Sequence, residues 1–215
     1  KDNNMRVLII GTARSGTSQL QRAFKEINKF KRYGEPWNKN MRVHGEHNLT
    51  MFPYPYKFED NCIVKTLVGQ YPHEIKNNEI EFYKTLVSEF DHTILLGRRD
   101  NEERLLSWTY QVEQLNKPKF IKQSWDWHNP YYIDREVNVD KFRDELEIES
   151  KLLIDVSNLV DIDITWYEDL YSGNDTKVNE VISKWSTSTI IDINKLKQFI
   201  DPKLRYRQFG KKKNI

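Results

Sequence analysis

The chain has 215 residues, 38% of them hydrophobic, and its 34 Lys and Arg residues nearly balance 32 Asp and Glu residues, which leaves a formal net charge of +2. A chain of this length buries roughly 70% of the surface that it exposes when unfolded, so it can form a hydrophobic core without disulfides. The single cysteine, Cys62, cannot form an internal disulfide, which excludes the small, disulfide-rich secreted class and favours a reducing compartment.

The same properties limit the partners of the protein. A net charge this close to zero does not indicate a nucleic-acid surface. No apolar run approaches the roughly 20 residues that span a membrane, and we expect no signal segment. We therefore expect one cytoplasmic domain over residues 1–215, with neither nucleic acid nor a membrane as its partner.

Short apolar runs alternate with helical stripes along the chain. Residues 7–10 are wholly apolar and are followed by Gly11, as is typical of a strand that is buried on both faces of a parallel sheet. From Ser18 onward, apolar residues recur every three or four positions as far as Phe30, which predicts a helix. Further strands, rich in β-branched or aromatic residues, are predicted at residues 62–66, 93–97 and 162–166. Further helices are predicted around residues 80–90, 105–115 and 142–156.

This alternation predicts an α/β fold with a central, mostly parallel sheet flanked by helices, similar to that of the P-loop NTPases. Ligands of such sheets bind beyond the carboxyl ends of the strands. Two long segments, residues 34–60 and 116–138, interrupt the pattern and are rich in aromatic residues. Long connections are commonly functional, so these segments are expected either to shape an acceptor pocket or to form a small second core.

A glycine-containing loop joins the first predicted strand to the first helix. Residues 11–16 have the GxxxxG spacing of a nucleoside-triphosphate loop, in which backbone N–H groups and the helix N-terminus bind phosphate. The Lys that normally follows is replaced by Thr17, and Arg14 supplies the positive charge instead. A later strand ends in Arg98 and Arg99, where a magnesium-binding ATPase would need a carboxylate. Both departures indicate a phosphate-containing donor that is bound without a metal.

Two of these segments resemble motifs of the sulfotransferase family, whose donor is 3′-phosphoadenosine 5′-phosphosulfate (PAPS). Residues 14–18, Arg-Ser-Gly-Thr-Ser, resemble the family's 5′-phosphosulfate loop. Arg99, followed eight positions later by Ser107, is similar to the motif that binds the 3′-phosphate. A second Arg falls at the position of Arg104, as in carbohydrate sulfotransferases.

A third match is the run Thr-Trp-Tyr-Glu-Asp-Leu at residues 165–170, which looks like the segment that closes a late strand in many members. The resemblance extends over nearly the whole chain, from about Arg6 to Phe209. It implies a PAPS-dependent sulfotransferase that acts on a hydroxyl group of a small molecule or carbohydrate, releases 3′,5′-adenosine bisphosphate and needs no metal. The donor would be bound by Arg14, Ser15, Gly16, Thr17, Ser18, Arg99 and Ser107.

Sulfuryl transfer to an alcohol requires a base for the hydroxyl proton and cations for the leaving phosphate oxygen. One branch of the family uses a His that follows a strand, but Leu67 stands at that position here. Other branches use a Glu after the first helix, and Glu35 has a comparable place. By this resemblance Glu35 is the expected base, with Arg14 and Lys65 as the catalytic cations. The alternative for Glu35 is an exposed carboxylate in an ordinary Gly-Glu-Pro turn.

Two other functions remain open from the sequence. A nucleotide kinase or other P-loop NTPase would fit the loop spacing but is opposed by Thr17. A non-catalytic nucleotide-binding module would have the phosphate motifs without a working base. His44 and His47 flank Glu46 at a spacing that suggests a metal, but no third His or Cys partner accompanies them in the sequence. These two histidines are instead the next candidates for the base.

Overall fold

The computed structural model describes residues 5–38, 55–72, 75, 78–115, 140–185 and 193–200. Most of the two long aromatic segments, including His44 and His47, lies outside these ranges, so their predicted role in an acceptor pocket stays a prediction.

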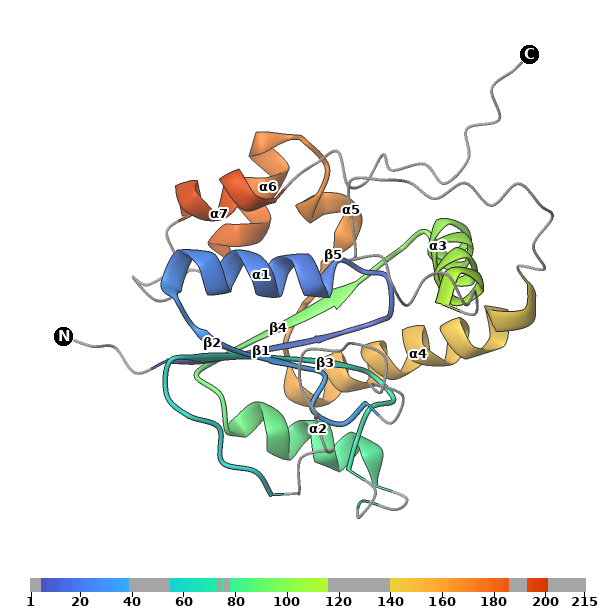
Figure 1. Ribbon diagram of the computed structural model, residues 1–215, viewed down its shortest axis with the longest axis horizontal. Coiled ribbons are helices and arrows are strands. Elements are labelled where there is room, and N and C mark those ends of the chain that lie inside the picture. Colours follow the sequence, from blue (N-terminus) through green and yellow to red (C-terminus); the bar gives the residue numbers. More distant parts are fainter. Residues whose placement is uncertain are drawn as a thin grey trace.

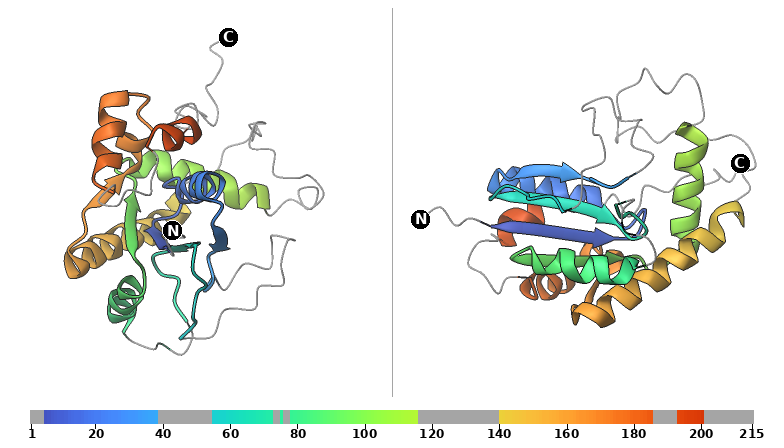
Figure 2. Two further views of the ribbon diagram at one scale, coloured as in Figure 1. Left: turned by 90° about the vertical axis from the view of Figure 1, so that its left-hand side faces the viewer. Right: turned by 90° about the horizontal axis from the view of Figure 1, so that it is seen from below.

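The strands form one sheet with the order β2-β3-β1-β4-β5, and every neighbouring pair is parallel. The predicted α/β fold with a central parallel sheet is therefore confirmed. All strands point the same way in Figure 2, so their carboxyl ends lie along one edge of the sheet. The strands are β1 (Arg6–Gly11), β2 (Lys31–Gly34), β3 (Cys62–Leu67), β4 (His92–Gly97) and β5 (Ile164–Trp166).

The edge strand β2 was not predicted, and the helix before it ends earlier than the sequence indicates. Its sequence, Lys-Arg-Tyr-Gly, buries only Tyr33, so it lacks the apolar run that marks the central strands. The helix predicted to reach Phe30 ends at Asn28, because Lys29 takes a left-handed conformation with φ of 55°. Phe30 still packs into the core, which explains why it continued the apolar stripe.

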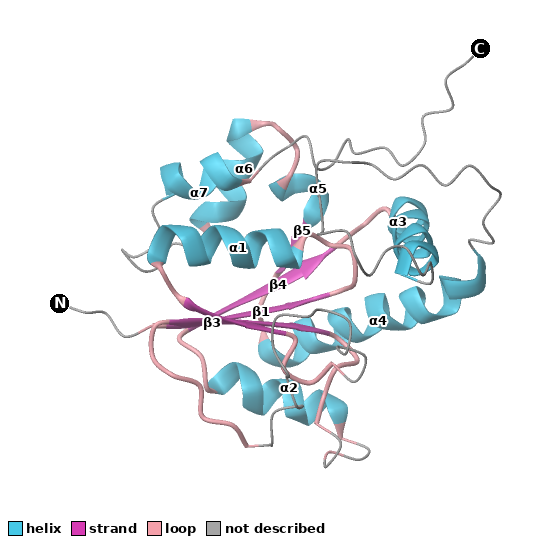
Figure 3. Ribbon diagram, in the orientation of Figure 1, coloured by secondary structure: helices cyan, strands magenta, loops and turns pink. Residues whose placement is uncertain are grey.

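Helices cover both faces of the sheet (Figures 1 and 3). Helices α1, α5, α6 and α7 lie on one face, and α2 and α4 lie on the other. The long α3 lies beyond the arrowheads of the strands in Figure 2. No helix within the described ranges has the length and apolar character needed to cross a membrane. The helices are α1 (Thr17–Asn28), α2 (Glu79–Ser88), α3 (Asn101–Leu115), α4 (Arg143–Val160), α5 (Tyr167–Leu170), α6 (Asp175–Ser183) and α7 (Ile193–Phe199), with a 3-10 turn at Asp140–Phe142.

The core is divided into two layers by the sheet. Alternate residues of a strand point to opposite faces, and β1 supplies both layers. Val7 and Ile9 pack with Phe24 of α1 on one side. Leu8 and Ile10 pack in the cluster on the other side, which includes residues of α2 and α4. Because β1 is central and buried on both faces, the loop that follows it lies in the middle of the carboxyl edge.

Candidate functional site

The loop between β1 and α1 is held by contacts within the loop and by Tyr171, the residue after α5. Gly16 has φ of +84°, and a Cβ atom there would lie 2.7 Å from the ring of Tyr171. The Tyr171 hydroxyl donates to the carbonyl of Gly16 over 3.0 Å. Inside the loop, Ser15 Oγ donates to the carbonyl of Thr12 over 2.7 Å. Helix α1 then begins at Thr17, so its positive end lies at this loop, as in known phosphate sites.

Arg14 connects the loop to α3. Its Nε donates to Ser107 Oγ over 2.8 Å, and its carbonyl accepts a hydrogen bond of 3.3 Å from the guanidinium of Arg98. Burial, and then the charge of Arg98, lower the pKa of Arg14 to about 10. Arg14 therefore stays protonated at neutral pH, but next to a second cation. A bound anion would reduce the repulsion between the two guanidinium groups.

Arg98, which the sequence analysis noted as a strand-end cation but did not include among the donor-binding residues, also lies at this site. It is only 9% exposed, and its guanidinium carbon lies 4.5 Å from the centre of the Tyr167 ring. It pairs with Glu103, and its Nε is 3.9 Å from a carboxylate oxygen of Glu168. Among the residues that the structure describes, this buried Nε has no hydrogen-bond acceptor. A buried donor of this kind favours an anionic or polar ligand nearby.

Lys65 and Glu35 meet at the same edge of the sheet. Lys65 is the fourth residue of β3 and is 5% exposed, and its Nζ donates to Ser18 Oγ, in the first turn of α1, over 2.9 Å. The same ammonium pairs with the carboxylate of Glu35. Strand β2 brings Glu35 there, because the Glu35 N–H continues the ladder to the carbonyl of Lys65 over 2.6 Å. A cation and a carboxylate thus lie together beside the loop at residues 11–16, which the sequence predicts to bind phosphate and which is called the phosphate loop below.

The Glu35 side chain is 15% exposed and differs from the alternative of an exposed turn carboxylate. It accepts hydrogen bonds from the Gln70 amide, at 3.0 Å, and from the Asn38 amide. Burial favours the neutral acid, but the charge of Lys65 and the hydrogen bonds from Lys65, Gln70 and Asn38 together lower the pKa of Glu35. Glu35 is therefore ionised at neutral pH, which is the state that can accept a proton.

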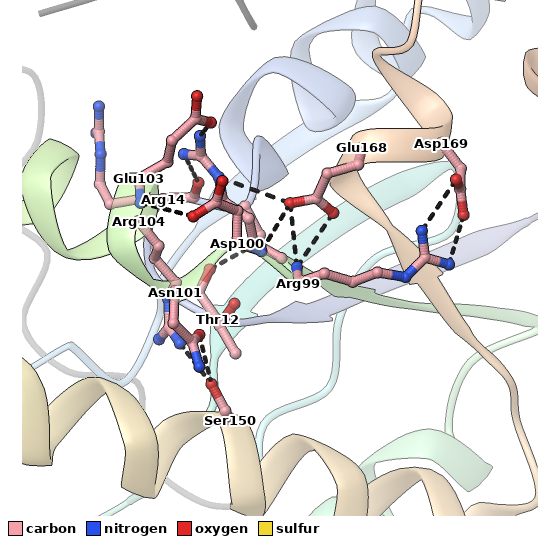
Figure 4. Close-up of polar contacts among 12 residues, drawn as sticks. Thr12, Arg14, Arg99, Asp100, Asn101, Glu103, Arg104, Ser150, Glu168 and Asp169 are labelled. Atoms are coloured by element: carbon pink, nitrogen blue, oxygen red, sulfur yellow. Dashed lines mark hydrogen bonds and ion pairs between the residues drawn. The ribbon is translucent and has the colours of Figure 1, made fainter.

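Arg99 points away from the phosphate loop and toward α5 (Figure 4). Its two terminal nitrogens donate to the two carboxylate oxygens of Asp169 over 3.0 and 2.7 Å. Its guanidinium also lies 5.1 Å from the centre of the Trp166 ring, and its backbone N–H donates to Glu168. The structure thus links Arg99 to Asp169 and links Ser107 to Arg14, whereas the sequence led us to expect Arg99 and Ser107 on one phosphate.

A pocket of about 270 Å³ opens beyond the carboxyl ends of β4 and β5. Its lining residues come from the strand ends, the loop after β1, the start of α3 and α4: Thr12, Gly97, Arg98, Arg99, Asn101, Ser150, Leu153, Ile154 and Trp166. The pocket therefore combines two arginines at the end of β4 with an aromatic residue and apolar side chains of α4.

Several residues of this site have no local sequence signal. Asn38 and Gln70 contact Glu35, and Glu168 and Asp169 contact the strand end at Arg99. Glu168 and Asp169 are 69 and 70 positions from Arg99 in the chain, so no local pattern indicates that they contact it. The only early indication was the family resemblance of residues 165–170, which did not say what these carboxylates contact.

Within the described ranges, no three His, Cys, Asp or Glu side chains are grouped as a metal site would require. A scan of the sequence against protein-family models found no match, and neither did a comparison with curated proteins.

Proposed function

We propose that the protein is a sulfotransferase that transfers a sulfuryl group from PAPS to a hydroxyl group of a small molecule or carbohydrate. The observation that carries the proposal is the position of Lys65, which contacts both Ser18 at the start of α1 and the carboxylate of Glu35. A cation for the transferred group and a base for the acceptor are therefore adjacent, at the place where a helix N-terminus can bind the donor.

The donor-binding half of the proposal is supported by cations at the carboxyl edge. The backbone of residues 15–18 and Arg14 would bind the 5′-phosphosulfate, in keeping with the resemblance of this loop. Ser107 and Arg99 would bind the 3′-phosphate, and Trp166 offers a ring against which the base could stack. Arg99 must then exchange Asp169 for the phosphate, which costs part of the binding energy.

The reaction would be an in-line displacement at sulfur. The acceptor oxygen attacks the sulfur atom, and the bond from sulfur to the bridging oxygen of the 5′-phosphate breaks. The hydroxyl proton passes to Glu35, and Arg14 and Lys65 neutralise the charge that develops on the bridging oxygen. Lys65 can serve this role because its ammonium already lies beside the first turn of α1. The free and buried thiol of Cys62 agrees with a reducing compartment, and we propose the cytoplasm.

Thermal-shift measurements with a ligand panel test the donor class without knowledge of the acceptor. In EDTA, 3′,5′-adenosine bisphosphate should raise Tm more than AMP does, because only the bisphosphate has the 3′-phosphate. At a concentration of 100 times Kd, the stabilisation should be about 2.7 kcal/mol. A preference for ATP with strict dependence on magnesium would overturn the proposal in favour of a P-loop kinase or NTPase.

A further inference from the structure

An ion pair beneath the phosphate loop is not used by the proposed reaction. Arg104 of α3 is fully buried, and its Nε donates to the carbonyl of Ala13 over 2.9 Å. One terminal nitrogen donates to the carbonyl of Leu146 and to Ser150 Oγ, over 2.8 and 2.7 Å. The other terminal nitrogen pairs with Glu149 of α4. The guanidinium thus joins the loop to α4, and Figure 4 shows its contact with Ser150.

Glu149 contacts the same loop residue. One of its carboxylate oxygens accepts the N–H of Ala13 over 3.0 Å, and the same oxygen pairs with Arg104. Both backbone polar groups of Ala13 are therefore taken by one ion pair, whose members come from two different helices. Glu149 lies 136 positions from Ala13 in the chain.

This pair is costly in its buried position. Burial raises the pKa of Glu149, although the charge of Arg104 and the Ala13 N–H oppose the shift. Burial likewise lowers the pKa of Arg104, although Glu149 opposes it. Buried ion pairs often contribute no more to stability than apolar residues of the same volume would. Their geometric effect on Ala13 is therefore the better account of why these two charges are buried here.

The effect on the loop follows from the position of Ala13. Its N–H points to Glu149, so it is not directed toward an anion at α1. The next residue, Arg14, has φ of 62°, a left-handed conformation that is unfavourable for a residue with a Cβ atom. The peptide groups on both sides of Ala13 must be restrained if this conformation is to persist in the absence of a ligand.

We propose that Arg104 and Glu149 are positioning residues of the phosphate loop. By binding both backbone groups of Ala13, they keep Arg14 left-handed and arrange the loop for an anion before the anion binds. The choice of ligand in the tests below rests on the proposed function. The restraint that the ion pair places on the loop without a ligand does not depend on that function.

Three substitutions at Glu149 separate position from charge. Glu149→Leu removes the carboxylate, and with it both the hydrogen-bond acceptor and the negative charge. Glu149→Asp keeps the negative charge but shortens the side chain by one methylene. Glu149→Gln keeps the length of the side chain and an acceptor oxygen but removes the charge. The measurement is amide hydrogen exchange of Ala13 in the free protein, by NMR, with the buried Ile9 of β1 as the internal reference for overall stability. Exchange of Ala13 should be about ten- to a hundredfold faster in Glu149→Leu, because a charge-assisted hydrogen bond is lost.

Measured relative to Ile9, exchange at Ala13 should also be fast in Glu149→Asp, and in Glu149→Gln it should stay within a few-fold of the wild type, because the amide oxygen can still accept the Ala13 N–H. The Asp variant keeps a negative charge for Arg104, so it remains informative even where Glu149→Leu does not fold. Glu102→Gln is the matched control, because Glu102 of α3 pairs with Arg143 at the surface. It should leave the exchange of Ala13 unchanged.

Two results would overturn the proposal. If Ile9 and Ala13 accelerate equally in all variants, the pair serves overall stability. If Glu149→Asp protects Ala13 as the wild type does while Glu149→Gln does not, charge and not position is what matters.

Calorimetric titration with 3′,5′-adenosine bisphosphate then tests the link to the ligand, with about a tenfold loss of affinity expected for Glu149→Asp. Failure of the bisphosphate to bind the wild type would reject the proposed function but leave the exchange result intact.

Discussion

The side chains of Arg14 and Ser107 are joined by a hydrogen bond of 2.8 Å from Nε to Oγ, across 93 positions of the chain. Arg14 belongs to the phosphate loop and Ser107 to α3, the two segments that the sequence presents as separate phosphate motifs. Their contact brings Ser107 of the second predicted motif to Arg14 of the first. It also means that a ligand phosphate at Ser107 would lie within reach of the cation in the loop.

The contact between Arg99 and Asp169 predicts opposite effects of two substitutions. Arg99→Ala should lower the affinity for 3′,5′-adenosine bisphosphate roughly ten- to a hundredfold, because charge-assisted hydrogen bonds contribute about 1.5 to 3 kcal/mol each. Asp169→Asn should raise the affinity for the bisphosphate several-fold, because Asp169 no longer forms the bidentate ion pair that competes for Arg99. Calorimetric titration measures both affinities.

AMP is the matched control ligand for this pair, since it has no 3′-phosphate and should be affected little by either substitution. Equal losses for AMP and the bisphosphate in Arg99→Ala would mean that Arg99 supports the fold rather than a 3′-phosphate site.

Glu35→Gln should separate an enzyme from a binding module. The amide keeps the volume and can still bind Lys65 but cannot accept a proton, so donor affinity should change little. Turnover with PAPS should fall by about a hundredfold or more, the usual range for a positioned acid or base. Glu59→Gln is the control, because Glu59 makes the exposed pair with Lys31. Full turnover in Glu35→Gln would mean that another residue is the base, and His44 and His47 would then be the next candidates.

The ion pair of Glu35 and Lys65 should also make stability depend on pH. The folded state lowers the pKa of Glu35, so the carboxylate stabilises the fold fully above its ordinary pKa of about 4.3. This contribution is lost as the pH falls through the lower, folded pKa. Urea unfolding should therefore give a wild type about 3 kcal/mol more stable than Glu35→Gln at pH 7, since the amide can accept a hydrogen bond from Lys65 but leaves the charge of this buried ammonium uncompensated.

Below about pH 4 that difference should shrink, because protonation removes the same charge from the wild type. A difference that stays constant from pH 7 to pH 3 would show that the substitution acts through packing and not through the ion pair.

Two glycines with the same positive φ distinguish backbone strain from steric contact. Gly16 and Gly69 both have φ of +84°, but a Cβ atom at Gly16 would meet the Tyr171 ring, whereas nothing lies within 4 Å at Gly69. Gly69→Ala should cost about 1 kcal/mol, the price of a left-handed alanine. Gly16→Ala should lower the unfolding free energy by about 1 to 3 kcal/mol more than Gly69→Ala does, and it should lower the affinity for the bisphosphate. Equal changes in the unfolding free energy would mean that Tyr171 moves away freely.

The architecture of the centre of the sheet was accessible from sequence because its signals are local. The apolar runs of β1, β3 and β4 are long enough to be identified alone, and the glycine spacing of the loop is a property of consecutive residues. The short edge strand β2 was missed because an edge strand with one buried side chain has no such pattern. The expected base, Glu35, was identified by resemblance, but its neighbours Asn38 and Gln70 were not.

Local patterns in the sequence identify the chemical groups at the carboxyl edge: a glycine loop with Arg14, a strand that contains Lys65, and another that ends in Arg98 and Arg99. Which of these charges are paired depends on how the chain folds. The tertiary structure pairs Lys65 with a carboxylate and directs Arg99 to α5, and it brings Glu149 to the loop from 136 positions away. Periodicity and spacing report on residues within one element, whereas ion pairs between elements depend on how the helices pack over the sheet, which no local pattern encodes.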